Sequence, residues 1–289
     1  MSSTTPEQDR MRAMVAALFD DAALFPPGNA PMTTAVPGHR AYRRAGFADL
    51  VGPFVAPASR VPELIAALGP GTALDPFEVV LVADSGVLGV EEAVGRLQDE
   101  DRVELVGLEV ALPRDGDPQR FARTVLDSLH FSVPAAIEIP FVPGWEQALD
   151  VLAQDGAERA KFRTGSPDPA AIPSPGQLAD AVLAATARRV PFKLTAGLHH
   201  ALRGAEATGG VDHHGFLNVL AATALALTGA QRAELVEVLS STAAGEVLAP
   251  LREADPGPLR AAMRSIGTCS IADPVTDLVG LGLLEPDAA

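Results

Sequence analysis

Cysteine is almost absent from the chain: Cys269 is the only one among 289 residues. A single cysteine excludes an internal disulfide framework and is typical of a reducing compartment. No apolar run is long enough to span a bilayer, since the longest, 216–227, is interrupted by Asn218 and Thr223. No signal-peptide pattern opens the sequence either. We therefore expect a soluble, cytoplasmic protein.

Basic residues are also in short supply, because 22 lysines and arginines face 37 aspartates and glutamates and leave a net charge of −15. A field of this sign repels phosphate backbones and anionic lipids, so we expect neither a nucleic-acid nor a membrane partner. The apolar share of 47% is ordinary for a soluble globular enzyme. A chain of this size buries enough surface to fold without a disulfide or a metal. The composition leaves open whether the chain forms a homo-oligomer.

Short apolar runs alternate with amphipathic stretches along most of the chain. The apolar runs, expected to be strands, cover residues 52–59, 77–84, 103–112, 135–142, 160–164, 191–197 and 265–271. The amphipathic stretches, expected to be helices, cover 62–68, 90–99, 118–129, 145–154, 175–188, 216–227 and 276–284. This alternation predicts parallel strands joined by crossover helices. Seven or eight such units, without a glycine-rich nucleotide-binding motif, favour an α/β fold of the (β/α)8 TIM-barrel type.

Two segments depart from this rhythm. Residues 1–45 predict an N-terminal helical extension, with helices over 9–19 and 33–45. Residues 201–264 are too long for one helix and show no clear strand, so they predict a helical insertion or conceal a strand. No shift in composition separates a second unit. We expect residues 1–289 to form a single barrel domain.

Polar side chains recur at alternate positions of the expected strands. Asp84 closes the 77–84 run, Glu109 and Glu138 lie between apolar neighbours, and Lys161 and Lys193 alternate with apolar residues in the same way. Alternate residues of a strand share a face, and barrel active sites lie at the carboxyl ends of the strands. These groups are therefore expected to meet at one mouth of the barrel. Taken singly, Asp84 or Glu109 is equally explained by a strand-end charge that reaches solvent.

Lys161 and Lys193 are the only lysines in the chain. Lysine is almost never fully buried unless it is paired, yet both lie inside runs that read as buried strand. The chemistry particular to lysine is imine formation with a carbonyl, which needs the neutral amine. The ordinary lysine pKa is about 10.4, and apolar walls or a second ammonium group nearby favour the neutral form. The pair therefore predicts an imine at Lys161, with the charge of Lys193 keeping that amine neutral.

Two short motifs carry a family resemblance. The sequence A-K-F-R-T-G lies at 160–165, and 32 positions after its lysine comes the lysine of K-L-T-A-G-L-H at 193–199. These motifs resemble the paired-lysine signature of class I aldolases related to deoxyribose-phosphate aldolase. In that family the lysine of a K-x-x-T-G strand forms the Schiff base, and a lysine in the next strand's K-x-x-x-G segment activates it. The resemblance implies these roles for Lys161 and Lys193.

The same resemblance extends to the last expected strand. The sequence I-G-T-C-S at 266–270 is similar to the family's I-G-T-S-S, whose backbone holds the substrate phosphate. This similarity implies substrate binding by Gly267, Thr268 and Ser270. The family's catalytic aspartate has only Glu109 or Glu138 as a counterpart here, and its basic residue after the second glycine is His199.

The alternation, or the loop that follows it, also assigns candidate roles to the other polar residues. Glu109, Glu138 and His199 are expected to move protons. The expected substrate contacts are Arg163, His200 and Asp84. Cys269 has no basic neighbour in sequence, which favours a small buried residue over a nucleophile.

Four of the six histidines, His199, His200, His213 and His214, fall within 16 residues. Such a group could ligate a metal, with Glu138 or Asp212 adding an oxygen ligand. Adjacent histidines on a regular strand point to opposite faces, so we expect neither a metal nor another cofactor.

The sequence thus predicts a class I aldolase-like lyase that acts on a small carbonyl metabolite through a lysine Schiff base. Two alternatives stay open at this point. One is a metal-dependent hydrolase or lyase that uses the histidines of 199–214. The other is a barrel that binds a small metabolite without turnover.

Overall fold

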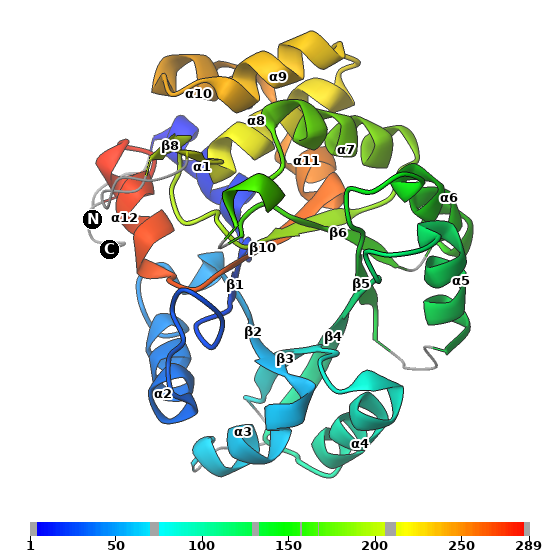
Figure 1. The fold of residues 1–289 in the computed structure, drawn as a ribbon. Coiled ribbons are helices and arrows are strands. Elements are labelled where there is room, and N and C mark those ends of the chain that lie inside the picture. The colour runs from blue at the N-terminus through cyan, green and yellow to red at the C-terminus, as the bar shows by residue number, and fades with distance from the viewer. Residues whose placement is uncertain are drawn as a thin grey trace.

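The computed structural model describes residues 5–69, 75–128, 133–156, 158–166, 168–205 and 212–285. Its centre is a closed barrel of parallel strands in the order β1-β10-β7-β6-β5-β4-β3-β2 (Figure 1). The strands are β1 (Phe19–Asp21), β2 (Val51–Pro57), β3 (Phe77–Val82), β4 (Val103–Ala111), β5 (Ala135–Glu138), β6 (Arg159–Arg163), β7 (Phe192–Thr195) and β10 (Met263–Thr268). The predicted (β/α)8 TIM barrel is confirmed, and this fold is common among enzymes.

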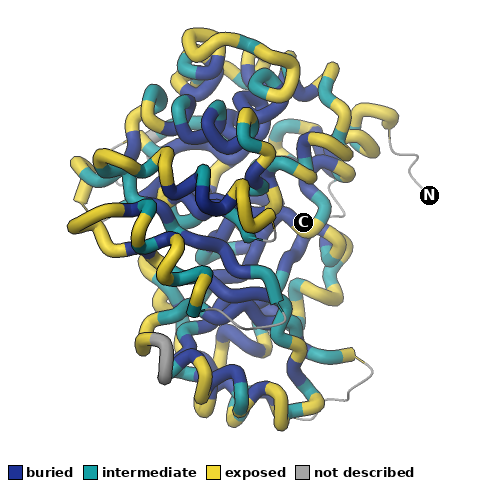
Figure 2. The backbone as a smooth tube through the Cα atoms, turned by 90° about the vertical axis from the view of Figure 1, so that its right-hand side faces the viewer, coloured by how far each residue is buried: buried dark blue, intermediate teal, exposed yellow. Residues whose placement is uncertain are grey.

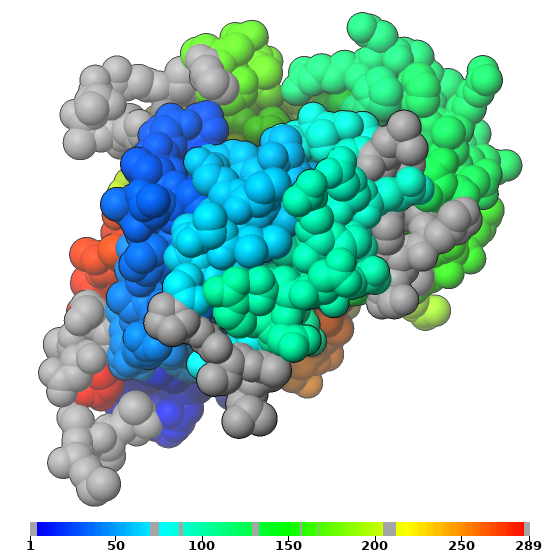
Figure 3. Space-filling model, turned by 90° about the horizontal axis from the view of Figure 1, so that it is seen from below, coloured from blue at the N-terminus to red at the C-terminus, as the bar shows by residue number. Residues whose placement is uncertain are grey.

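Helices surround the barrel between successive strands (Figure 1). They are α2 (Met32–Tyr42), α3 (Val61–Ala67), α4 (Gly86–Gln98), α5 (Pro118–Ser128), α6 (Trp145–Asp155), α7 (Pro175–Ala187), α8 (Phe216–Leu227) and α12 (Ala272–Gly280). Most bounds agree with the expected ranges within a few residues, although Leu129, the expected end of α5, lies outside the described residues. Helix α7 shows why such predictions succeed: Ser174 and Gln177 form a capping box, and Pro175 occupies the first turn. Seen from below, α2, α3 and α4 lie side by side along one flank (Figure 3).

The hydrophobic core lies between the barrel wall and these helices (Figure 2). Phe162 on β6 and Phe192 on β7 are fully buried, with ring centroids 6.1 Å apart. Because each alternates with a lysine, the outward phenylalanines turn Lys161 and Lys193 toward the barrel interior. The packing of apolar side chains on the outer face of the barrel thus determines which side chains point into its interior.

The first 45 residues correct one prediction, because they contain a barrel strand. Helix α1 (Pro6–Val15) ends four residues before the predicted end at Phe19, and β1 follows it. Strand β1 pairs with β10 and β2 and closes the barrel. The prediction of a purely helical extension is therefore wrong. Three residues, two of them aspartates, are too short a run to show strand alternation.

Apart from Met263 and Arg264, which begin β10, the described part of the segment 201–264 adds no strand to the barrel. It holds a small antiparallel pair, β8 (Gly204–Ala205) and β9 (Asp212–His213), outside the barrel. After α8 come the helices α9 (Arg232–Ser240), α10 (Ala244–Glu253) and α11 (Pro256–Ala262). Among the described helices, none combines the length and the apolar character that crossing a bilayer requires.

Candidate active site

Lys161 and Lys193 lie opposite each other in the register of β6 and β7. Both are buried in the barrel interior. The Nζ atom of Lys161 lies 2.6 Å from Oε2 of Glu109 and 2.8 Å from Oε2 of Glu138. Strands β4 and β5, which follow β6 around the barrel, supply these two carboxylates. Lys161 is therefore held between two acids.

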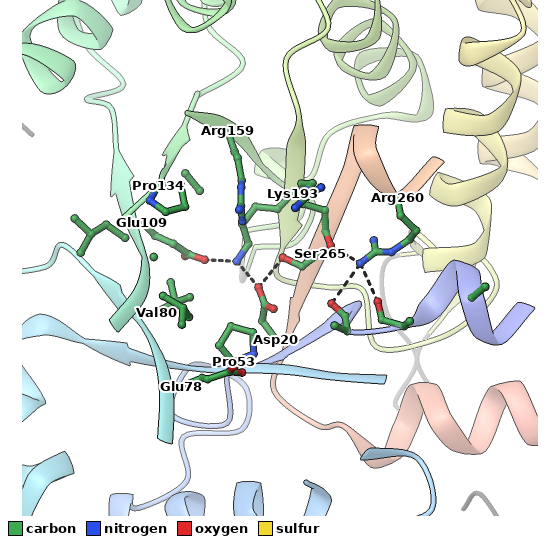
Figure 4. Close-up of a pocket in the computed structure, with 18 residues that line it drawn as sticks. Asp20, Pro53, Glu78, Val80, Glu109, Pro134, Arg159, Lys193, Arg260 and Ser265 are labelled. Carbon is green, nitrogen blue, oxygen red and sulfur yellow. Dashed lines mark hydrogen bonds and ion pairs between the residues drawn. The ribbon is translucent and has the colours of Figure 1, made fainter. Parts of the chain in front are cut away.

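Lys193 has a different pair of acids. Its Nζ atom lies 2.6 Å from Oδ2 of Asp20 and forms a second ion pair with Oε1 of Glu109. The hydroxyl of Ser265 donates to the same Asp20 oxygen at 2.7 Å (Figure 4). Glu109 thus uses one carboxylate oxygen for each lysine and lies between them.

Arg163 completes the set at the end of β6. Its Nε donates to Oε1 of Glu138 at 2.8 Å, and a second guanidinium nitrogen donates to Oε2 at 3.3 Å. We call the six residues that interact in this way the interior salt-bridge network: Arg163, Glu138, Lys161, Glu109, Lys193 and Asp20. Three carboxylates and three cations balance, which is what burial of so many charges requires.

These contacts set the protonation states in the network. Burial alone would raise the pKa of Glu109, but the ammonium groups of Lys161 and Lys193 lower it to about 2. Burial likewise opposes the charge of Glu138, and Lys161 and Arg163 nevertheless hold its pKa below the usual range. For Lys193, burial favours the neutral amine, yet Asp20 and Glu109 together hold its pKa well above the ordinary lysine value.

The position of Glu109 changes the expected role of Lys193. We expected the charge of Lys193 to act on Lys161 directly, but a carboxylate lies between the two amines and pairs with both. Two buried ammonium groups without a counter-ion would cost far more than the paired arrangement. Lys193 therefore neutralises part of the charge that Glu109 would otherwise present to Lys161.

A cavity of about 500 Å³ opens at the carboxyl ends of the strands, where barrel enzymes carry their active sites. We call it the C-terminal mouth. It brings together six of the predicted site residues: Lys161, Glu109, Glu138, Arg163, His199 and Gly267. Apolar side chains, including Phe25, Val55 and Val82, line the opposite wall. A few polar groups facing an apolar wall are typical of a small-molecule site.

Other predicted site residues lie away from this mouth. Lys193 lines a second cavity, at the other end of the barrel. Asp84 is exposed at the end of β3 and accepts hydrogen bonds from the backbone and hydroxyl of Ser59. His200 is exposed, with Nδ1 3.1 Å from Oδ2 of Asp277. The structure therefore does not bring Asp84 and His200 to the lysines, because each is held at the surface by a local partner.

Strand β10 and the residues that follow it make structural contacts, and Gly267 of this strand lines the mouth. The buried Thr268 hydroxyl lies 3.3 Å from Nδ1 of His199 and donates to the backbone oxygen of Ser270 at 2.9 Å. The hydroxyl of Ser270 accepts from the backbone amide of Asp273 at 3.3 Å, at the start of α12. Thr268 thus orients a histidine of the mouth, and Ser270 fixes the helix that follows.

The four clustered histidines point to different partners. His214 is buried, its Nε2 lies 2.7 Å from the backbone oxygen of Pro173, and burial lowers its pKa. His199 and His213 line the C-terminal mouth, whereas His200 is exposed. Within the described ranges no three histidine, cysteine or acidic side chains are grouped to hold a metal ion. The geometry therefore gives no support to a metal centre built on residues 199–214.

Sequence reasoning missed two acidic residues and one contact. Asp20 and Asp21 lie on the unrecognised strand β1, where Asp20 pairs with Lys193 and Asp21 lies 3.1 Å from Nδ1 of buried His39. Cys269 has no basic neighbour in sequence and was expected to be a small buried residue, but it is only partly buried, and its Sγ lies 3.6 Å from Nδ1 of His199, 70 positions away. The sequence feature that could have identified these two acids is a pair of adjacent aspartates between apolar residues. No pattern in the sequence around either residue predicts the Cys269–His199 contact.

The glycines of the two lysine motifs have a steric reason. A Cβ atom on Gly165 would lie 2.8 Å from Cα of Gly197, and Gly197 has φ of +75°. The hydroxyl of Thr164 donates to the backbone oxygens of Thr195 and Ala196, at 3.1 and 2.5 Å. These contacts tie the ends of β6 and β7 together beside Lys161.

Comparisons with models of protein families, with curated proteins and with solved structures give no match to this chain. A function for this chain is therefore inferred from the geometry of the site.

Proposed function

We propose that the protein is a class I aldolase-like lyase in which Lys161 forms a Schiff base with a small carbonyl metabolite. One observation carries the proposal: Lys161 is a buried lysine that lines the C-terminal mouth, and two carboxylates lie within 2.8 Å of its amine. Lys193, in contrast, lines the opposite cavity and is bound by Asp20 and Glu109.

The two carboxylates can handle the protons that imine formation requires. The ammonium group of Lys161 first gives a proton to a carboxylate, and the free amine attacks the carbonyl carbon. The resulting carbinolamine expels its hydroxyl as water when the carboxylic acid returns that proton. Glu138 suits this role better than Glu109, because Glu109 is paired with two ammonium groups and has a pKa of about 2.

The network also favours the product of this step. A protonated imine carries the same single positive charge as the ammonium group that it replaces. Glu109 and Glu138 can therefore pair with the imine without rearrangement, which is the preorganised electrostatics that catalysis uses. The imine then accepts the electron pair of the carbon–carbon bond that breaks, and an enamine results.

The remaining polar residues of the mouth fit the substrate's other groups. Cleavage also requires a base that takes the proton of the substrate hydroxyl, and His199 lines the mouth beside Thr268. Arg163 is partly exposed at the rim and can pair with an anionic substituent. The apolar wall of Phe25, Val55 and Val82 excludes water from the reactive imine.

The test is reductive trapping. The protein is equilibrated with short aldehydes and with 2-keto acids, sodium borohydride is added, and peptides are mapped by mass spectrometry. An adduct on Lys161 is expected, and it should be absent in Lys161→Arg. Lys193→Met removes the other lysine, so the adduct should remain on Lys161, formed at a changed rate because Glu109 then pairs with Lys161 alone.

Two results would contradict the proposal. One is an adduct on Lys193 instead of Lys161. The other is turnover of an identified carbonyl substrate with no adduct on either lysine. Saturable binding of such a compound with neither adduct nor turnover would instead indicate a metabolite-binding barrel.

A further inference from the structure

A second cavity, of about 460 Å³, lies at the amino ends of the strands, beneath the interior salt-bridge network (Figure 4). We call it the N-terminal cavity. Its wall includes Asp20, Lys193 and Ser265 from the strands and Ala13 and Ala16 from the region of α1. A cavity of this size is within the range of small-ligand sites.

Three arginines line the N-terminal cavity: Arg159 at the start of β6, Arg260 on α11 and Arg264 on β10. Arg260 is fixed in place, because it donates to the backbone oxygens of Met263 at 2.5 Å and of Ala16 at 3.1 Å. Within the described part of the chain, the side chains of Arg159 and Arg264 make no hydrogen bond or ion pair. Two of the three guanidinium groups are therefore available to a ligand.

The carboxylates of the cavity are already engaged. Asp20 accepts from Lys193 and Ser265, and Glu109 pairs with both lysines. Glu78 is 3.8 Å from Arg43. Positive charge is thus left over at the arginine side of the cavity, in a chain whose net charge is −15.

The arginines also repel one another. Burial lowers the pKa of Arg159, and the nearby charge of Arg264 lowers it further. Burial and Arg264 likewise lower the pKa of Arg260, to about 10. Asp20, and for Arg159 also Glu158, oppose these effects only in part, so a bound anion would add the missing counter-charge.

We propose that the N-terminal cavity is a binding site for a small metabolite bearing a multiply charged oxyanion, a phosphate or a pair of carboxylates, held by Arg159 and Arg264. Arginine's planar fork matches both kinds of oxyanion. The volume exceeds that of one oxyanion, so the ligand includes a carbon skeleton. The site is separate from the C-terminal mouth and does not depend on the Schiff-base chemistry proposed there.

The probes are inorganic phosphate, pyrophosphate and malonate, titrated at constant ionic strength against sodium chloride. Thermal unfolding and calorimetry are recorded for the full chain. Saturable binding is expected, with a rise in Tm of about 5 °C at a probe concentration one hundred times Kd. Arg159→Gln and Arg264→Gln should each weaken binding about tenfold or more, since each removes a charge-assisted contact.

Two matched variants locate the site. Arg163→Gln removes the arginine of the C-terminal mouth, and Arg96→Gln removes an exposed arginine of α4 that pairs with Glu92. Arg96→Gln should bind the probes as the unmodified protein does, and Arg163→Gln should keep the binding that Arg159→Gln and Arg264→Gln weaken, losing only anion contacts at the C-terminal mouth. If Arg159→Gln does not fold, Arg264→Gln carries the test, because Arg264 is exposed and its replacement leaves the core unchanged.

Three outcomes would overturn the proposal: no saturable response beyond that of chloride, equal responses in all variants, or loss of binding in Arg163→Gln alone. Binding of the phosphates without malonate would assign a phosphorylated ligand, and the reverse a dicarboxylate. Binding of both kinds of probe supports the site without separating them.

Discussion

Lys161 and Lys193 are register partners on β6 and β7, yet their amines lie on opposite sides of Glu109 and line opposite cavities. Only Lys161 therefore lies where a substrate entering the C-terminal mouth would meet it. Lys193 contributes its charge from behind Glu109. This difference supports a reactive role for Lys161 and a positioning role for Lys193.

The first prediction concerns acid stability. The pKa of Glu109 is about 2 in the folded chain, whereas the ordinary pKa of a glutamate, which applies to the unfolded chain, is 4.5. Because the folded value is depressed, Glu109 stabilises the fold above pH 4.5, and this contribution is lost as the pH falls toward 2. The loss is expected to reach about 3 kcal/mol in the free energy of unfolding. Urea unfolding between pH 2 and 7 measures it.

Glu109→Gln should remove most of this acid dependence and destabilise the chain at neutral pH by about 3–5 kcal/mol, because two buried ammonium groups lose their shared counter-ion. Glu104→Gln is the matched control, on the same strand but exposed. It should be close to neutral. An unchanged acid dependence in Glu109→Gln would show that other groups cause it.

The second prediction concerns the Asp20–Lys193 ion pair. Asp20→Asn and Lys193→Met should each cost about 3–5 kcal/mol, since each leaves a buried charge short of its partner. The double variant should cost less than the sum of the two, with a coupling energy of about 1.5 kcal/mol or more in urea unfolding. The exposed pair Asp180–Arg232 is the comparison and should show little coupling. Strict additivity of Asp20→Asn and Lys193→Met would contradict the observed contact.

The third prediction separates a proton-transfer role for Glu138 from a structural one. Glu138→Gln should slow reductive trapping at Lys161 by about a hundredfold, because the proton acceptor is lost. The pH dependence of trapping should change with it. Arg163→Gln disrupts the same local structure but keeps the carboxylate, so its effect should be smaller. Equal effects of the two variants, with an unchanged pH profile, would indicate that Glu138 only maintains the structure.

The fourth prediction uses Cys269 as a reporter. Its side chain lines the C-terminal mouth beside His199 and is partly accessible. Reductive trapping of a carbonyl compound on Lys161 should slow alkylation of this thiol by iodoacetamide at least about tenfold, since the adduct occupies the same cavity. The single cysteine makes the readout unambiguous. An unchanged alkylation rate would place the adduct outside the mouth.

The extent of sequence-based prediction differs among the strands. Strands β2 to β7 and β10 were predictable, because long apolar runs between amphipathic stretches leave few alternatives. Strand β1 was not, since Phe19–Asp21 has only three residues and two of them are aspartates. Its position next to β2 and β10 follows from barrel closure, which is a tertiary property. The absence of β1 from the prediction also concealed Asp20, the partner of Lys193.

The candidate site was predictable in part for the same reason. Alternation placed Lys161, Lys193 and Glu109 in the interior, and all three are there. It did not show which end of the barrel each amine faces, because that depends on the tilt and stagger of the strands. Alternation also does not predict that Ser59 holds Asp84 at the surface, or that Asp277 does the same for His200.

Glu109 lines both the C-terminal mouth and the N-terminal cavity. The side chain of Glu109 thus lies between the two cavities and separates them. A much smaller residue at this position would connect the cavities and turn the barrel into a tube open to water along its axis. A crystal structure of Glu109→Ala would reveal such a tube as a continuous file of ordered water, and two compartments that face opposite sides of the molecule would become one.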